Sequence, residues 1–152
     1  MIHNRFVSFR RDVRGATSVE FGFVAVPMLM FIFGAIEFSR AYWTQSSLEQ
    51  TAATVARCMG LELSNCAVNN VYNAALTQSY AQTVAGKWGL TLPASDLTLN
   101  STASCGGVSG FSQVTINHTF NSMVPGVVTV LGHNFVLTAS ACFPNGGASG
   151  GV

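Results

Sequence analysis

The sequence predicts an α+β protein: a long N-terminal helix, membrane-embedded in its first part, packed on a small domain with a second helix and an antiparallel sheet of about three strands. First, a basic segment is followed by a 16-residue uncharged, mostly apolar run, Phe21–Ile36. Second, only 9% of residues are charged and the mean hydropathy is +0.39, whereas about a quarter of residues are charged in a typical soluble domain. Third, three later segments alternate apolar and polar residues, as half-buried strands do. The 152 residues suffice for one modest domain plus an anchor.

The long helix is expected over residues 17–59. Its first part is apolar all round, as a lipid-facing helix is. Pro27 should kink it or remove one backbone hydrogen bond. Gly60 is a plausible stop. Beyond the apolar run, residues recurring at helical spacing predict an apolar stripe: Phe38, Ala41, Tyr42, Leu48, Ala52, Val55 and Met59.

The rest of the chain predicts the second helix and the sheet. The second helix is expected over residues 67–86, and strands are expected over 96–104, 113–120 and 135–143. The Gly/Ser-rich tail, residues 145–152, is expected to be mobile. The predicted apolar face of the second helix comprises Val68, Val71, Tyr72, Ala75, Leu76 and Tyr80.

The charges predict the orientation of the apolar helix. Four arginines and one aspartate give residues 1–15 a net charge of +3, and three basic against five acidic residues give residues 16–152 a net charge of −2. The positive-inside rule then keeps Arg10, Arg11 and Arg14 cytoplasmic and the C-terminal part periplasmic. Nucleic acid is not an expected partner, because no aromatic residues interleave with these arginines and no basic patch occurs elsewhere.

The apolar run has features of a retained membrane helix. No A-x-A cleavage site follows it in the right place, which argues against a removed signal peptide. The stretch between Glu20 and Glu37 would span about 24 Å, short of a bilayer core of about 30 Å. Tyr42 and Trp43 are expected to form an interfacial aromatic belt beyond it.

The four cysteines are disulfide candidates, because an exported domain favours disulfides. They are Cys58, Cys66, Cys105 and Cys142, and three pairings are possible. Pairing Cys58 with Cys66 and Cys105 with Cys142 is the simplest, since each pair is local. The second pair joins cysteines of opposite strand parity and would need a bulge, or one cysteine beyond its strand end. No C-x-x-C spacing supports a zinc site, so no metal is expected.

The start of the helix carries the most specific pattern in the chain. An acid there is costly, at about 2.5–3.5 kcal/mol for Asp at the centre of a membrane helix, so Glu20 needs a partner. A basic leader, Gly15, an acid five residues later and an apolar helix resemble a type IV prepilin. The segments Arg14–Phe21 and Phe33–Phe38 resemble, more narrowly, the TadE-like pseudopilins of tight-adherence pilus systems.

This resemblance implies a function. A prepilin peptidase would cut between Gly15 and Ala16, removing residues 1–15. Glu20 would then meet the new amine of a neighbouring subunit at Ala16, setting register. The fold implied is pilin-like: a helix over 16–60, transmembrane over about 17–38, and a disulfide-linked domain over 61–152. The expected partners are the peptidase, other pilin or pseudopilin subunits, the inner-membrane assembly machinery and lipid, for a minor subunit of the inner membrane or pilus.

Two other functions are compatible with the sequence. One is an uncleaved single-pass inner-membrane protein that presents a periplasmic binding domain. The other is a tethered enzyme, against which the few titratable groups of residues 61–152 argue, so no catalytic residue and no cofactor are expected. His118, on the apolar face of a strand, is expected to be a satisfied or edge histidine rather than a metal ligand. The apolar segment Met123–Leu131 is either a crossover covering the core or a docking patch.

Overall fold

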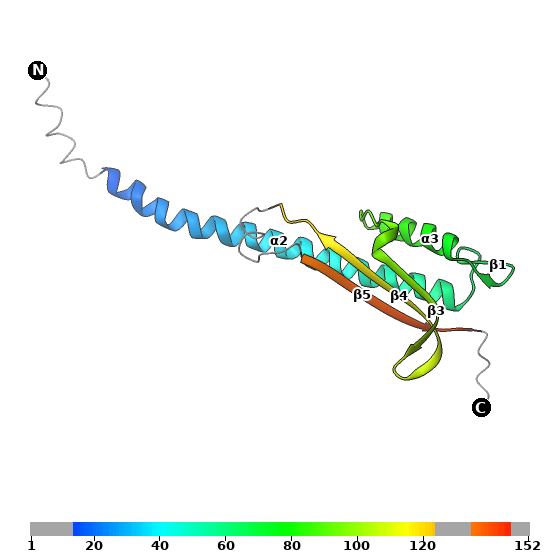
Figure 1. The fold of residues 1–152 in the computed structure, drawn as a ribbon. Coiled ribbons are helices and arrows are strands. Elements are labelled where there is room, and N and C mark those ends of the chain that lie inside the picture. Colours follow the sequence, from blue (N-terminus) through cyan, green and yellow to red (C-terminus); the bar gives the residue numbers. More distant parts are fainter. Residues whose placement is uncertain (1–13, 124–134, 147–152) are drawn as a thin grey trace, which may run out of the picture. The chain divides into compact units, whose positions relative to one another are not determined.

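The computed structural model describes residues 14–123 and 135–146 (Figure 1). The chain forms two compact units, residues 1–38 (the first unit) and residues 39–152 (the second unit). The predicted α+β class is confirmed. Helix α2 (Arg14–Gly60) begins in the first unit and ends in the second. The other elements belong to the second unit: β1 (Ala67–Val68), β2 (Val71–Tyr72), α3 (Ala74–Lys87), η1 (Ala94–Asp96), β3 (Leu97–Cys105), β4 (Val108–Phe120) and β5 (Phe135–Pro144).

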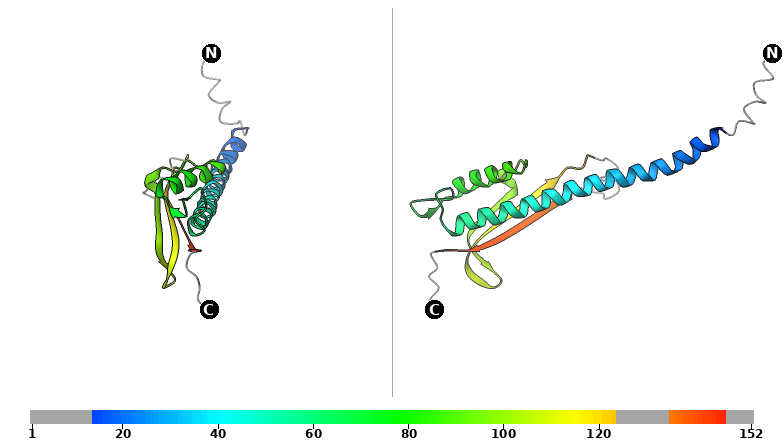
Figure 2. Two further views of the ribbon diagram at one scale, coloured as in Figure 1. Left: turned by 90° about the vertical axis from the view of Figure 1, so that its right-hand side faces the viewer. Right: turned by 180° about the vertical axis from the view of Figure 1, so that it is seen from behind.

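The core of the second unit lies between two helices and a sheet. Helix α3 runs alongside the C-terminal part of α2, and the three-stranded sheet packs across them (Figures 1 and 2). Burial of this apolar surface is the main stabilising term of the unit. The fully or nearly fully buried residues come from all of these elements: Leu48, Ala52 and Val55 of α2, Ala81 and Ala85 of α3, Val114 and Ile116 of β4, and Leu137 and Ala139 of β5.

The predicted stripe on α2 is correct in its second half and wrong at Phe38 and Tyr42, while Ala41 is half-buried. Leu48, Ala52, Val55 and Met59 are buried. Phe38 and Tyr42 were expected on the same stripe, but they are exposed to 73% and 70%. On the part of α2 nearer the start of the second unit, the buried residues are instead small and polar: Thr44, Ser47 and Thr51.

These buried hydroxyls are satisfied within the helix. Thr44, Ser47 and Thr51 each donate to the carbonyl oxygen four residues earlier, at 2.8–2.9 Å. A buried hydroxyl costs little when it is hydrogen-bonded. Short side chains therefore allow the sheet to approach α2 closely, and an apolar-residue pattern cannot detect such positions.

The predicted antiparallel sheet of three strands is confirmed, and its strand order is β3-β4-β5. Val114 of β4 lies opposite Leu99 on one side and Ala141 on the other. Side chains of β3 and β5 alternate between the core and solvent, so one face of the sheet covers the helices.

The prediction of a helix over 67–86 is wrong at its start. Residues 67–72 form the small hairpin β1–β2, and α3 begins only at Ala74. Asn69 and Asn70 adopt φ values of 51° and 61°, which are left-handed conformations that asparagine tolerates better than most residues and that a two-residue hairpin turn requires. Asn73 then caps α3, accepting a hydrogen bond from the Leu76 N–H at 3.1 Å.

The predicted apolar face is only partly correct: Tyr72 and Tyr80 pack against the core, but the other predicted members do not. Val68 and Val71 are exposed hairpin residues, and Leu76 is exposed on α3. The buried face consists instead of Thr77, Ala81, Val84 and Ala85. The Thr77 hydroxyl donates to the Asn73 carbonyl at 2.8 Å, so a polar residue again replaces an apolar one at a buried helix position.

The cysteines form two disulfides, Cys58–Cys66 and Cys105–Cys142. The first links the last turn of α2 to the segment before β1. The second links the end of β3 to β5, two strands that both pair with β4. The register of β3 on β4 shifts between Asn100 and Ser104. The two shifts cancel, so Ser104 and Cys105 pair with β4 in the same register as residues 97–100, and Cys105 is the last residue of β3.

A candidate assembly helix

The first turns of α2 hold the residues expected to act in processing and assembly. Arg14, Gly15 and Ala16 lie in the first turn of the helix, and Glu20 lies one turn beyond Ala16 on the same face, at i, i+4. Arg10 and Arg11 lie outside the described residues. The Glu20 side chain is exposed, and among the described residues it has no hydrogen bond or ion pair.

The helix surface that follows is apolar and uncovered by the chain. An 18-residue window of α2 has a mean hydropathy of 2.1, and none of that window is buried. Phe21, Phe23 and Phe31 are exposed to 74–80%. By length and composition this is a helix able to cross a membrane, and it is the one such helix among the described residues. Its exposed apolar side chains need lipid or another protein as a partner.

The middle of this surface is indented around Pro27. Val19, Gly22, Phe23, Val26 and Pro27 line a shallow hollow. Proline lacks an N–H, so it cannot donate the usual hydrogen bond to the carbonyl four residues earlier. A Cβ atom built on Gly22 would meet nothing within 4 Å, so the chain itself does not require glycine there.

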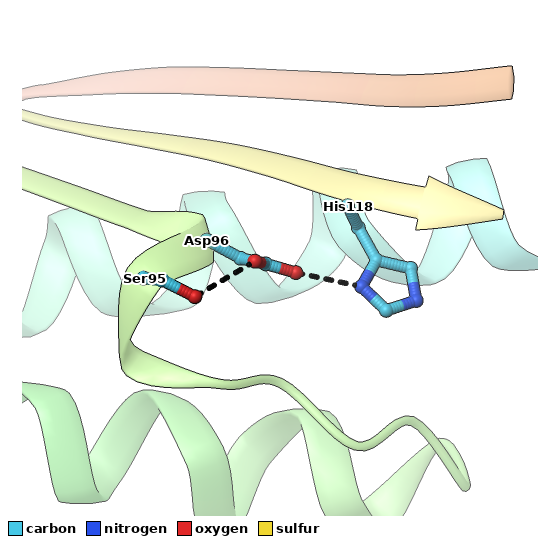
Figure 3. Close-up of polar contacts among 3 residues, drawn as sticks. All are labelled: Ser95, Asp96 and His118. Atoms are coloured by element: carbon cyan, nitrogen blue, oxygen red, sulfur yellow. Dashed lines mark hydrogen bonds and ion pairs between the residues drawn. The ribbon is translucent and has the colours of Figure 1, made fainter. Parts of the chain in front are cut away.

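In the second unit, His118 is held by a carboxylate. Its Nδ1 lies 3.0 Å from Oδ2 of Asp96, and both side chains are about one-fifth exposed (Figure 3). His118 comes from β4 and Asp96 from η1, so the contact fixes this turn to the sheet. The prediction of a satisfied histidine is confirmed. Its partner was missed, because the two residues are 22 positions apart.

The same cluster lacks the geometry of a serine nucleophile. The Ser95 hydroxyl donates to Oδ1 of Asp96 at 3.3 Å, so the carboxylate lies between the hydroxyl and the imidazole (Figure 3). Nucleophilic catalysis needs the imidazole next to the hydroxyl, with the carboxylate behind it. Within the described ranges, no group of three or more His, Cys, Asp or Glu residues could hold a metal ion.

The apolar segment Met123–Leu131 can be placed only at its first residue. Met123 is 76% exposed, and the remainder of the segment lies outside the described residues. Whether it is a crossover or a docking patch therefore stays a prediction.

The comparisons with known proteins address the same helix. Neither the curated proteins nor the solved structures gave a match. The model of the TadE-like protein family matches residues 15–57. That range begins at Gly15, includes Glu20 and the apolar surface, and ends within the last turn of α2. The recognition made from the sequence is thereby confirmed: helix α2 of this chain is TadE-like.

Proposed function

We propose that this chain is a minor pilin or pseudopilin of a tight-adherence-type pilus assembly system, processed after Gly15 by a prepilin peptidase. The TadE-like match suggests a Tad pilus-associated protein, and the finer role is argued from the helix. The observation that carries the proposal is Glu20, an exposed acid without a partner among the described residues, at the start of an uncovered apolar helix.

The acid and the proposed cleavage point explain each other. Cleavage after Gly15 would create an α-amine at Ala16, and the amine of a neighbouring subunit would supply the opposite charge that Glu20 needs. A charge in apolar surroundings is costly when alone and is stabilised when paired with good geometry. The pair would thus favour one axial register between neighbouring helices over others.

The second unit fits a structural rather than an enzymatic role. Its two disulfides suit an oxidising compartment, which supports a periplasmic location for this unit, and the positive-inside rule supports a cytoplasmic location for residues 1–13. The long apolar helix suggests membrane anchoring in the inner membrane before or instead of filament entry. The Ser95–Asp96–His118 arrangement serves packing of η1 on β4 in this proposal, and the chain needs no cofactor.

The proposal is tested in a host strain lacking this chain and complemented with variants. Glu20→Gln removes the charge and keeps the shape. Glu49→Gln is the matched control: it is the same exchange on the same helix, and exposed Glu49 accepts a hydrogen bond from the Gln45 side chain at 2.9 Å on the helix surface. Exposed contacts of this kind contribute little to stability. Surface pili should be lost with Glu20→Gln and kept with Glu49→Gln, at equal amounts of each chain in the membrane.

Two results would contradict this role. Normal pili in the strain lacking the chain would exclude a necessary part in pilus assembly. Normal pili with Glu20→Gln, in a strain that does need the chain, would exclude the proposed charge pair and leave an uncleaved anchor presenting a binding domain as the better function.

A further inference from the structure

The exposed aromatic side chains of the second unit gather at one end of it. Among the described residues of this unit they are Tyr42, Trp43, Trp88 and Phe135, which we name the aromatic end. The other aromatic residues described in the unit are at least partly buried. Large exposed aromatic residues confined to one end of a domain indicate a contact surface.

The fold brings the two tryptophans together from positions 45 residues apart. The Trp43 and Trp88 rings meet edge to face, with centroids 6.2 Å apart. They remain 59% and 42% exposed, so the contact joins them without covering them. A pair that served only packing would be expected to bury more of two such large apolar side chains.

The end of α3 holds Trp88 in place. The Trp88 N–H donates to the Ala85 carbonyl at 3.0 Å, and the Leu90 N–H donates to the same oxygen at 3.1 Å. Gly89 provides the left-handed turn, with φ of 75°, that ends the helix. The indole is therefore presented by a capped helix end rather than by a long loop.

The start of β5 belongs to the same end of the unit. Phe135 pairs in register with Phe120 of β4, and the guanidinium of Arg40 lies 5.5 Å from the Phe120 ring. Arg40 precedes Trp43 by one turn of α2. Exposed Lys87 adjoins Trp88, so the aromatic end carries an exposed cation.

We propose that the aromatic end rests in the headgroup region of the bilayer, so that Trp88 is a second membrane contact far from the transmembrane segment in sequence. This rests on the membrane anchoring argued under the proposed function. Trp and Tyr concentrate at the membrane–water interface, and lysine and arginine there meet lipid phosphates. In the chain, Trp43 follows residue 38, where the transmembrane segment is expected to end, by only five residues, about 8 Å of helix. That length stays within the headgroup region, since the interfacial layers add about 5–8 Å on each side of the hydrocarbon core.

Such a contact would orient the second unit. A single helix leaves a domain free to tilt and rotate above the bilayer, whereas a second anchor from α3 fixes which side faces the lipid. The outer end of the unit, with the β3–β4 hairpin and the Cys58–Cys66 disulfide, would then point away from the membrane and be available to partners.

The chain itself supplies the probe, because it contains two tryptophans. Trp43→Phe leaves Trp88 as the sole reporter, and Trp88→Phe leaves Trp43. Each full-length variant is reconstituted in phosphatidylcholine–phosphatidylglycerol vesicles with and without lipid brominated near the headgroup, and tryptophan quenching is measured. The control carries Leu63→Trp in the double Trp→Phe background. Leu63 is 45% exposed, close to the exposure of Trp88, and lies beyond Gly60 at the opposite end of this part of α2, about 25 Å of helix from Trp43.

Trp88 should be quenched at least about twofold more strongly than the Leu63→Trp reporter, as an interfacial residue is. Quenching of Trp43 without quenching of Trp88 would overturn the second contact while leaving the anchoring intact. Absence of quenching at both tryptophans would overturn the anchoring as well. Equal quenching of Trp88 and the Leu63→Trp reporter would also overturn the proposal, because the unit would then have no fixed side toward the lipid.

Discussion

Gly60 ends α2 at a point where the sheet leaves no room for a side chain. A Cβ atom built there would lie 2.6 Å from Cδ1 of Phe143 and 2.7 Å from the carbonyl oxygen of Pro144. The phenyl ring could move, but the backbone oxygen is held by its strand. The same backbone region is fixed by a hydrogen bond of 2.6 Å from the Gly146 N–H to the Gly60 carbonyl. Gly60→Ala must therefore displace β5 from α2.

The expected cost is about 1–3 kcal/mol, the range for adding a methyl group to a filled site. Gly86→Ala is the matched control, because it is the same exchange near the end of α3, where a Cβ atom would meet nothing within 4 Å. Alanine there should stabilise the protein by up to about 1 kcal/mol through its higher helix propensity. The two substitutions are thus predicted to have opposite signs.

The assay is urea unfolding of the full chain in detergent micelles, with both disulfides intact, followed by tryptophan fluorescence. Gly60→Ala should lower the unfolding midpoint and Gly86→Ala should raise it or leave it unchanged. A Gly60→Ala protein as stable as the wild type would refute the close approach of α2 and β5. If both variants lost the same free energy of unfolding, the clash at Gly60 would not be the cause, and the loss would come from replacing glycine itself.

The same unfolding assay checks two further predictions. Replacing the Cys105–Cys142 pair by serines should lower the free energy of unfolding by about 4 kcal/mol, and replacing the Cys58–Cys66 pair should lower it by about 2.5 kcal/mol. The difference arises because the cross-linked loops differ in length, with sequence separations of 37 and 8. A larger loss for the shorter loop would contradict this entropic ranking. Burial raises the pKa of Tyr72 above its ordinary value of 10.0, and a hydrogen bond with Thr77 offsets part of the rise. Since the folded state favours the neutral phenol, the free energy of unfolding should be unaffected below about pH 10 and should fall as the pH rises through the raised pKa. Tyr72→Phe should remove that fall. An equally steep alkaline loss of stability in Tyr72→Phe would show that other groups cause it.

The uncharged apolar run predicted the first part of the long helix, and the alternation of apolar and polar residues predicted the three strands. Such patterns failed where polar residues are buried or where asparagine shapes the backbone. As a polar residue, Thr51 is expected to face solvent, yet it is fully buried and its hydroxyl donates a hydrogen bond to the Ser47 carbonyl. Asn69 and Asn70 lie within an apparently helical pattern, yet their left-handed conformations turn the chain into a hairpin.

Some features of the candidate site could likewise be predicted from the sequence and others could not. Gly15 and Glu20 could be recognised because their spacing is local and their chemistry is unusual at the start of an apolar helix. The contacts of Trp43 with Trp88 and of His118 with Asp96 could not be, because they depend on tertiary packing of segments 45 and 22 residues apart. A single sequence carries no signal for such pairs beyond the residue types themselves.

Cleavage after Gly15 distinguishes a pilin from an uncleaved membrane anchor, and the N-terminus of the mature chain reports that cleavage. Intact mass and N-terminal sequence would be measured on membrane-extracted protein from cells with and without their prepilin peptidase. The prediction is a chain that begins at Ala16 only when the peptidase is present. A chain that still begins at Met1 in both strains would contradict processing and favour an uncleaved single-pass membrane protein.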